Sequence, residues 1–117
     1  MVRIVRFETA ETPAEEGAPD RILSGRPVTA TRNHHTSADG RFFSGEWRSS
    51  PGAWRVLYDE DEFVTVLEGR CVLTDEQGHA ETFGPGQSFV IPKGFSGTWE
   101  TLEPLRKLYA IYVPPSS

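Results

Sequence analysis

The stretch GQSFVIPKGFSG, residues 86–97, decides the fold of this chain. It opens with a glycine typical of a turn and continues with the short apolar run SFVI. Pro92 and Gly94 then form a rigid corner, because proline fixes its own backbone angle and glycine accepts turn conformations closed to other residues. The stretch therefore predicts two short β-strands joined by a tight turn.

Similar signals continue on both sides of this stretch. Runs rich in aromatic and β-branched residues recur at a spacing of about ten residues, with Gly and Pro turns between them. The predicted strands cover residues 41–48, 53–58, 63–67, 71–74, 79–83, 88–91, 97–102 and 107–113. Residues 31–40 are expected to form a polar loop, and residues 68–70 a tight turn. The pattern predicts an all-β barrel or sandwich, since no helix-length amphipathic segment competes.

The first thirty residues lack this regularity. Segment 8–27 carries several prolines, glycines and acids and shows no period of 2 or 3.6. We expect residues 1–30 to form a partly irregular N-terminal arm that lies on the barrel or pairs with a neighbouring subunit. Residues 31–117 are expected to form a single barrel domain.

Composition excludes several classes of partner. The net charge of −5 argues against binding the phosphate backbone of a nucleic acid. No apolar run reaches the roughly 20 residues of a membrane helix, and the N-terminal stretch lacks the continuous apolar run of a secretory signal. The single cysteine, Cys71, cannot form an internal disulfide, which fits a reducing compartment. We therefore expect a cytoplasmic protein without a nucleic-acid or membrane partner, with Cys71 as a buried apolar residue.

Two spaced motifs carry a resemblance. Residues 86–97 follow the pattern G-x5-P-x-G-x2-H, except that Gly97 stands in place of the histidine. Upstream, the pattern G-x5-H-x-H-x3-4-E-x6-G is matched at Gly52, Glu62 and Gly69. These are the two motifs of cupins, so the chain resembles that superfamily of jelly-roll barrels. The resemblance implies a single-domain, RmlC-like cupin β-barrel with an extended N-terminal arm.

A narrower resemblance concerns cupins related to ureidoglycine aminohydrolase. The phrases that carry it are PG-x-WRV (51–56), EF-x3-LEG (62–69), F-x-PG (83–86), IPKGF-x-G-x-WE (91–100) and RK-x-Y (106–109). This resemblance implies a manganese-dependent hydrolysis of a small nitrogen-rich metabolite.

The metal-ligand positions of the motifs hold no histidine. Counted from Gly52, the two histidine positions hold Tyr58 and Glu60; counted back from Glu62, they hold Val56 and Tyr58. Glu62 is thus the one usual ligand that survives in either register. A catalytic metal commonly needs three protein ligands. We therefore expect no cofactor.

Two histidines outside the motifs could supply metal ligands. His34 and His35 are adjacent, so on an extended chain their side chains point to opposite sides, and we expect a solvated loop pair. In the alternative, one of them reaches the barrel mouth. A divalent metal (Mn, Ni, Zn or Fe) would then need Glu62 together with Glu60 or with His34 or His35.

Glu62 has two open interpretations. If the motif holds, its side chain points into the barrel, where an isolated charge costs several kcal/mol. In the functional interpretation it anchors a ligand or acts as a general acid or base, with Tyr58 as its partner. In the structural interpretation it forms an internal salt bridge with Lys107 or Arg55.

The residues predicted to line the barrel lumen are Trp54, Val56, Tyr58, Glu62, Gly97, Trp99, Lys107 and Tyr109. An aromatic lining with a few polar groups suits a small organic ligand, although aromatic residues also simply fill barrels. Gly97 would leave room for a ligand or for Trp99.

Three functions are compatible with these observations. The first is a cupin with a degraded metal site that binds a small polar metabolite in the lumen. The second is an aminohydrolase- or isomerase-like enzyme that uses Glu62, with or without a divalent metal. The third is a structural or interaction protein that acts as a homodimer, and a homodimer is expected in all three cases.

Overall fold

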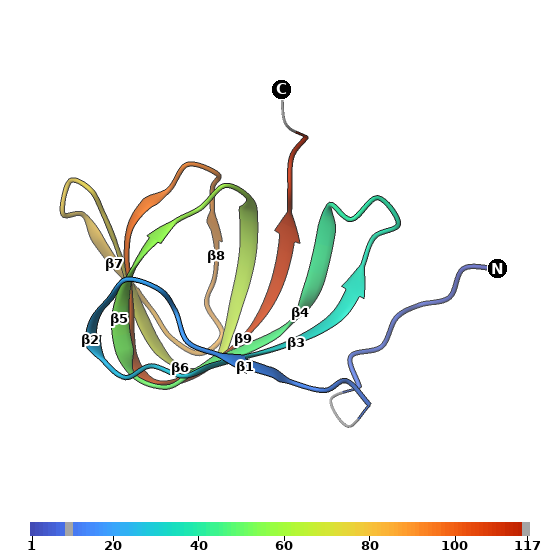
Figure 1. Cartoon of the computed structure of the whole chain (residues 1–117), viewed down its shortest axis with the longest axis horizontal. Helices are drawn as coiled ribbons and strands as arrows, with labels where there is room; N and C mark the ends of the chain where they lie inside the picture. The colour runs from blue at the N-terminus through green and yellow to red at the C-terminus, as the bar shows by residue number, and fades with distance from the viewer. Residues whose placement is uncertain (9–10, 116–117) are drawn as a thin grey trace.

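Nine β-strands follow one another along the chain, with no helix among the described residues, 1–8 and 11–115. In this computed structural model they curl into one barrel (Figure 1). The strands are β1 (Glu15–Gly17), β2 (Ile22–Gly25), β3 (Thr29–Thr36), β4 (Phe42–Ser49), β5 (Gly52–Leu57), β6 (Asp61–Asp75), β7 (Ala80–Phe83), β8 (Ser88–Ile91) and β9 (Ser96–Tyr112). The predicted all-β class is confirmed, and so are the two strands flanking the Pro92–Gly94 corner.

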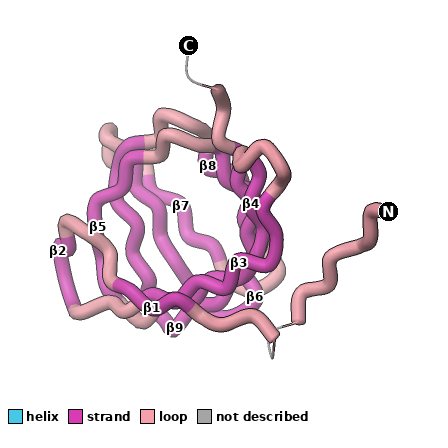
Figure 2. Tube along the Cα trace, turned by 45° about the vertical axis from the view of Figure 1, so that its right-hand side comes forward, coloured by secondary structure: helices cyan, strands magenta, loops and turns pink. Residues whose placement is uncertain are grey.

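Two long antiparallel strands, β6 and β9, form the frame of the barrel. They pair along almost their whole length, and each also pairs with shorter strands: β6 with β7 and β8, and β9 with β4 and β5. The sheet runs β1-β3-β4-β9-β5-β2, and β6 joins it through β9. Figure 2 shows the resulting ring of strands, with β5 on one side and β4 on the other.

The tight turn predicted at residues 68–70 is wrong. This segment is a set of irregularities within β6, where the register to β9 shifts between Val66 and Cys71. Gly69 has φ of +83°, and a side chain there would strike the backbone of Pro104 on β9. Such bulges bend a strand without ending it, so one bent strand replaces two predicted ones in both β6 and β9.

The polar loop predicted at residues 31–40 is also wrong in its first half. Residues 29–36 form β3, which pairs with β4 on one side and β1 on the other. Polar residues can form this strand because Thr29, Thr31 and Asn33 on one face line a cavity, and His34 on the other face is covered by Glu46 and by the N-terminal arm. The turn signal at Asp39-Gly40 is confirmed, since Gly40 has φ of +73° and its amide bonds to the Ser37 carbonyl.

The N-terminal arm lies on its own barrel in part. β1 pairs with β3 and β2 with β5, which brings residues 15–25 onto the rim. The first residues of the chain project away from the barrel (Figure 1). The domain boundary at residue 30 stays a prediction.

The core fills the barrel on one side of the cavity. Its buried members are Trp54, Val64, Val66, Cys71, Leu73, Ile91, Trp99 and Leu105. Cys71 is fully buried, as predicted, and burial raises the pKa of its thiol to about 11, so the thiol stays protonated and unreactive. None of the described residues belongs to a helix long and apolar enough to cross a membrane.

Candidate functional site

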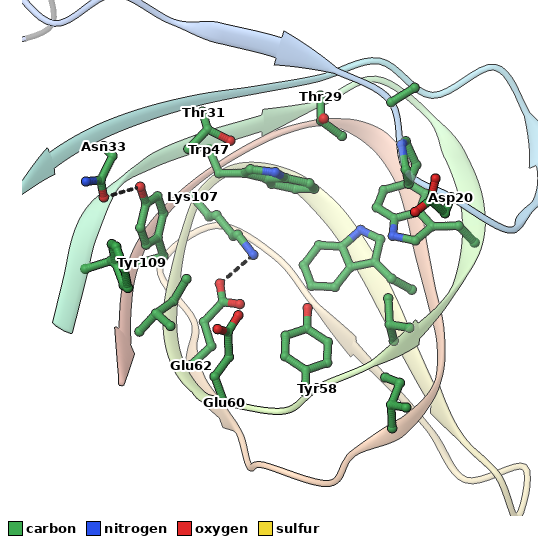
Figure 3. Close-up of a pocket in the computed structure, with 18 of the residues that line it drawn as sticks. Asp20, Thr29, Thr31, Asn33, Trp47, Tyr58, Glu60, Glu62, Lys107 and Tyr109 are labelled. Atoms are coloured by element: carbon green, nitrogen blue, oxygen red, sulfur yellow. Dashed lines mark hydrogen bonds and ion pairs between the residues drawn. The ribbon is translucent and has the colours of Figure 1, made fainter. Parts of the chain in front are cut away.

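A cavity of about 770 Å³ lies inside the barrel, in the size range typical of small-molecule sites (Figure 3). It is lined from β3, β4, β5 and β9, from Glu62 on β6, from the loop at residues 58–60, and from the rim segment at 15–20. The predicted lumen residues found in its lining are Trp54, Val56, Tyr58, Glu62, Trp99, Lys107 and Tyr109.

Gly97 does not line the cavity, which corrects the prediction for this position. It lies on β9 between Val56 of β5 and Asp75 of β6. A side chain at Gly97 would overlap the carbonyl oxygen of Thr74. The glycine therefore allows β6 to approach β9 closely, and it leaves no space for a ligand.

Glu62 and Lys107 form a buried ion pair in the cavity wall (Figure 3). Their Oε2 and Nζ atoms are 2.8 Å apart, and the residues are 5% and 4% exposed. The Lys107 ammonium also lies 4.4 Å from the ring centre of Trp47 and 4.6 Å from that of Trp99. Of the two salt bridges left open by the sequence, the one with Lys107 forms, whereas Arg55 pairs with Glu76.

The chain's three tryptophans all line this cavity and contact one another. Trp47 packs edge-on against Trp99 with ring centres 5.5 Å apart, and Trp54 stacks with Trp99 at 6.3 Å. The Trp99 indole donates a 2.9 Å hydrogen bond to Thr101, whose hydroxyl donates to Ser49. The Trp99 indole is therefore held in a fixed orientation.

The corner that decides the fold also positions Tyr58. The Tyr58 amide donates to the Phe95 carbonyl at 2.9 Å, and the Gly94 amide donates to the Tyr58 carbonyl at 2.7 Å. Gly94 can take this position because its φ is +96°. Burial, with smaller effects of Glu62 and Glu60, raises the pKa of the Tyr58 hydroxyl. The hydroxyl stays protonated and points into the cavity (Figure 3).

Glu60 follows Tyr58 in the same loop, and its carboxylate lies beside that of Glu62 (Figure 3). Partial burial raises the pKa of Glu60, and the charges of Asp59 and Glu62 add to this effect. Glu62 is compensated by Lys107, whereas no described residue forms a hydrogen bond or ion pair with the Glu60 side chain.

Tyr109 closes the opposite wall. Its hydroxyl donates a 2.8 Å hydrogen bond to Asn33 on β3, and burial raises its pKa to about 12. Sequence reasoning missed Asn33 and Trp47 as lining residues. The available signal was strand alternation, which puts Trp47 on the same face of β4 as Phe43 and Gly45.

The solvated pair predicted for His34 and His35 is wrong for His34, whose side chain is 1% exposed. It lies on the outer face of β3, with Nε2 3.1 Å from Glu46 and Nδ1 3.0 Å from the Thr12 hydroxyl. The Phe7 ring stacks on it at 4.4 Å. His35 follows in the same strand, and neither histidine lines the cavity.

These residues do not fit the manganese centre implied by the narrower resemblance. Within the described ranges, no three His, Cys, Asp or Glu side chains gather as metal ligands. The surviving ligand, Glu62, is engaged by the Lys107 ammonium, a cation that occupies the place next to the carboxylate.

Comparisons with solved structures place this barrel among known folds. The chain is 19% identical to the EutQ protein of Clostridium difficile, with a TM-score of 0.66, covering 74% of this chain and 64% of that one. It is 24% identical to a protein of unknown function from Pseudomonas syringae pv. tomato, with a TM-score of 0.78, covering 86% of this chain and 45% of that one. The chain thus spans less than two thirds of the length of both.

A third similar structure is the polyketide cyclase RemF from Streptomyces resistomycificus. It is 26% identical, with a TM-score of 0.68, and the match covers 98% of this chain and 83% of that one. No curated protein matches the chain significantly.

The family model described as EutQ-like cupin domain matches residues 36–109. This range covers more than half of the chain and contains both sequence motifs, the segment Tyr58–Glu62 and all three tryptophans. The chain therefore belongs to the EutQ-like cupin domain family.

Proposed function

We propose that this protein binds a small polar metabolite inside the barrel, between the tryptophan wall and the Glu62–Lys107 pair. The observation that carries the proposal is a buried ion pair that lines a largely aromatic cavity. Burying such a pair costs so much solvation that apolar residues of similar size are often at least as stable. A buried ion pair next to a cavity of about 770 Å³ is a combination typical of a small-molecule binding site.

The direct test is mass spectrometry of the full chain purified without added metal, under native and then denaturing conditions, together with elemental analysis. We expect a small organic molecule released on denaturation and no stoichiometric transition metal. About one tightly held transition metal per chain would overturn the proposal, because the metal would then organise the lumen. The ureidoglycine aminohydrolase resemblance and the cytoplasmic location both stay predictions.

A second candidate function is proton transfer at a carbon atom next to a carbonyl group. It is favoured by the Glu62 carboxylate and the protonated Tyr58 hydroxyl facing one cavity. The similarity to a polyketide cyclase over 98% of the chain adds support. In this reaction Glu62 takes the proton from carbon, the electron pair moves to the carbonyl oxygen, and Tyr58 donates a hydrogen bond to that oxygen.

The test is hydrogen–deuterium exchange at the α-carbon of the metabolite recovered from the protein, followed by NMR in heavy water. Glu62→Gln should abolish the catalysed exchange while the circular dichroism spectrum stays unchanged. Unchanged exchange in Glu62→Gln would remove Glu62 from the mechanism and leave a binding protein.

A further inference from the structure

The lining of the cavity carries more negative than positive charge. Its carboxylates are Glu15, Asp20, Glu60 and Glu62, and its cations are Arg55 and Lys107. Both cations are engaged, Lys107 by Glu62 and Arg55 by Glu76 outside the lining. The carboxylates of Glu15, Asp20 and Glu60 therefore have no cationic partner among the described residues.

These three carboxylates differ in depth. Glu15 and Asp20 lie exposed on the rim, where their field attracts cations and repels anions on the way in. Glu60 is partly buried beside Glu62, where a negative charge is costly without a partner. A positively charged group in the cavity would compensate it directly.

The Tyr58 hydroxyl is a second, independent feature of the same place. The Tyr58 side chain is half-buried, its hydroxyl points into the cavity near the Glu60 carboxylate (Figure 3), and no described residue forms a hydrogen bond with that hydroxyl. A ligand group that donates protons can use the Glu60 carboxylate and the Tyr58 oxygen as acceptors together.

The tryptophan wall suits the same kind of ligand. Trp47 and Trp99 already hold one ammonium group, that of Lys107, over their ring faces. Trp47 is half-buried and presents accessible aromatic surface to the cavity, whereas Trp54 and Trp99 are buried and stack with each other. Aromatic faces attract cations and also bury flat apolar groups.

We infer that the lumen selects a small organic amine whose ammonium group donates hydrogen bonds to Glu60 and Tyr58 and whose flat apolar body lies on the tryptophan wall. This inference rests on the proposed function and names its ligand class. Glu60 is then the residue that determines specificity for charge. An anion of the same shape would be repelled by the Glu60 carboxylate, and the lining cation Lys107 is already paired with Glu62.

The test compares three probes of similar shape: phenethylamine, phenethyl alcohol and phenylacetate. All three tryptophans line the cavity, so the intrinsic fluorescence of the protein reports on the lumen. We expect the amine to bind about tenfold more tightly than the alcohol, and phenylacetate to bind most weakly, because a hydrogen bond to a charged group contributes at this level.

Two variants assign the preference to Glu60. Glu60→Gln keeps the shape and should bring the amine and the alcohol to similar affinities. Asp59→Asn is the matched control: Asp59 is exposed, adjacent and outside the lining, and its substitution changes the net charge equally, so the preference should persist.

The outcomes separate the two proposals. If the alcohol binds as tightly as the amine in the wild-type protein, or if Glu60→Gln keeps the preference, the inference is wrong while the lumen remains a binding site. If none of the three probes changes the fluorescence, the inference falls together with the proposed binding of small organic molecules.

Discussion

At the scale of single residues, the Glu62–Lys107 pair offers a direct energetic test. Lys107→Met removes one partner and leaves the Glu62 charge buried, which should lower the free energy of unfolding by about 3–5 kcal/mol. The control is Lys93→Met, which alters the chain's other lysine. Because Lys93 is exposed, this substitution should change the free energy of unfolding by less than about 0.5 kcal/mol. Urea unfolding measures both. Adding Glu62→Gln to Lys107→Met should recover much of the loss, and equal effects of the two lysine variants would contradict this assignment.

Glu60 predicts a dependence of stability on pH. Its pKa is raised above 4.5 in the folded state, so the folded protein holds that proton more tightly than the unfolded chain. The resulting stabilisation is complete below about pH 4.5 and is lost as the pH rises through the raised value. Glu60→Gln should therefore have a higher melting temperature than wild type at pH 7, and the difference should shrink towards pH 4.5. A variant less stable than wild type at pH 7 would contradict this.

Sequence reasoning placed most lumen residues for a physical reason. Motif spacing fixes the register of β5 and of the loop after it, and alternation then assigns Trp54, Val56 and Tyr58 to one face. It failed for His34, whose partners Glu46 and Thr12 come from distant segments, because local polarity resembles that of a loop. It missed Glu60 as a lumen carboxylate in its own right, since a loop has no alternation to follow.

At the scale of strands, Gly97 tests how β6 and β9 fit together. In Gly97→Ala the new methyl group would overlap the Thr74 carbonyl, so the strands must separate locally. We expect a loss of about 1–3 kcal/mol in the free energy of unfolding, as for other overpacked sites. Gly17→Ala is the control, because its methyl group would meet Thr29 only at an ordinary distance of 3.8 Å. Denaturant unfolding that does not distinguish the two variants would refute the close approach.

The length of these strands could not be predicted. A glycine between two charged residues, as at 68–70, is typical of a turn, and only the pairing with β9 makes it a bulge instead. Likewise Glu103 and Pro104 suggest that the strand ends there. Strand β9 nevertheless continues, because it bends opposite the irregular part of β6 and stays paired with it. Turn chemistry is local, whereas a bulge depends on a partner strand about 35 residues away in the chain.

At the scale of the whole molecule, four of the exposed apolar side chains lie on neighbouring strands of the outer surface. Phe63 on β6 lies opposite Val90 on β8, and Phe42 on β4 lies opposite Tyr112 on β9. Their exposures are 48%, 57%, 40% and 45%, respectively. Because β4, β9, β6 and β8 are neighbours in the sheet, these residues form one outer apolar patch. Contiguous patches of this kind mark protein interfaces more often than scattered residues do.

We expect this outer apolar patch to pair with the same patch of a second copy, since a two-fold dimer uses one surface twice. Light scattering at micromolar concentration should give twice the mass of the chain for wild type, and the mass of one chain for Phe63→Glu. Leu102→Glu is the matched control: Leu102 is 45% exposed on β9 but lies toward the other end of that strand, so the dimer should persist. The ligand probes should still bind to Phe63→Glu, because Phe63 is not part of the cavity lining. A monomeric wild-type protein, or a monomeric Leu102→Glu variant beside a dimeric Phe63→Glu variant, would exclude this patch as the interface.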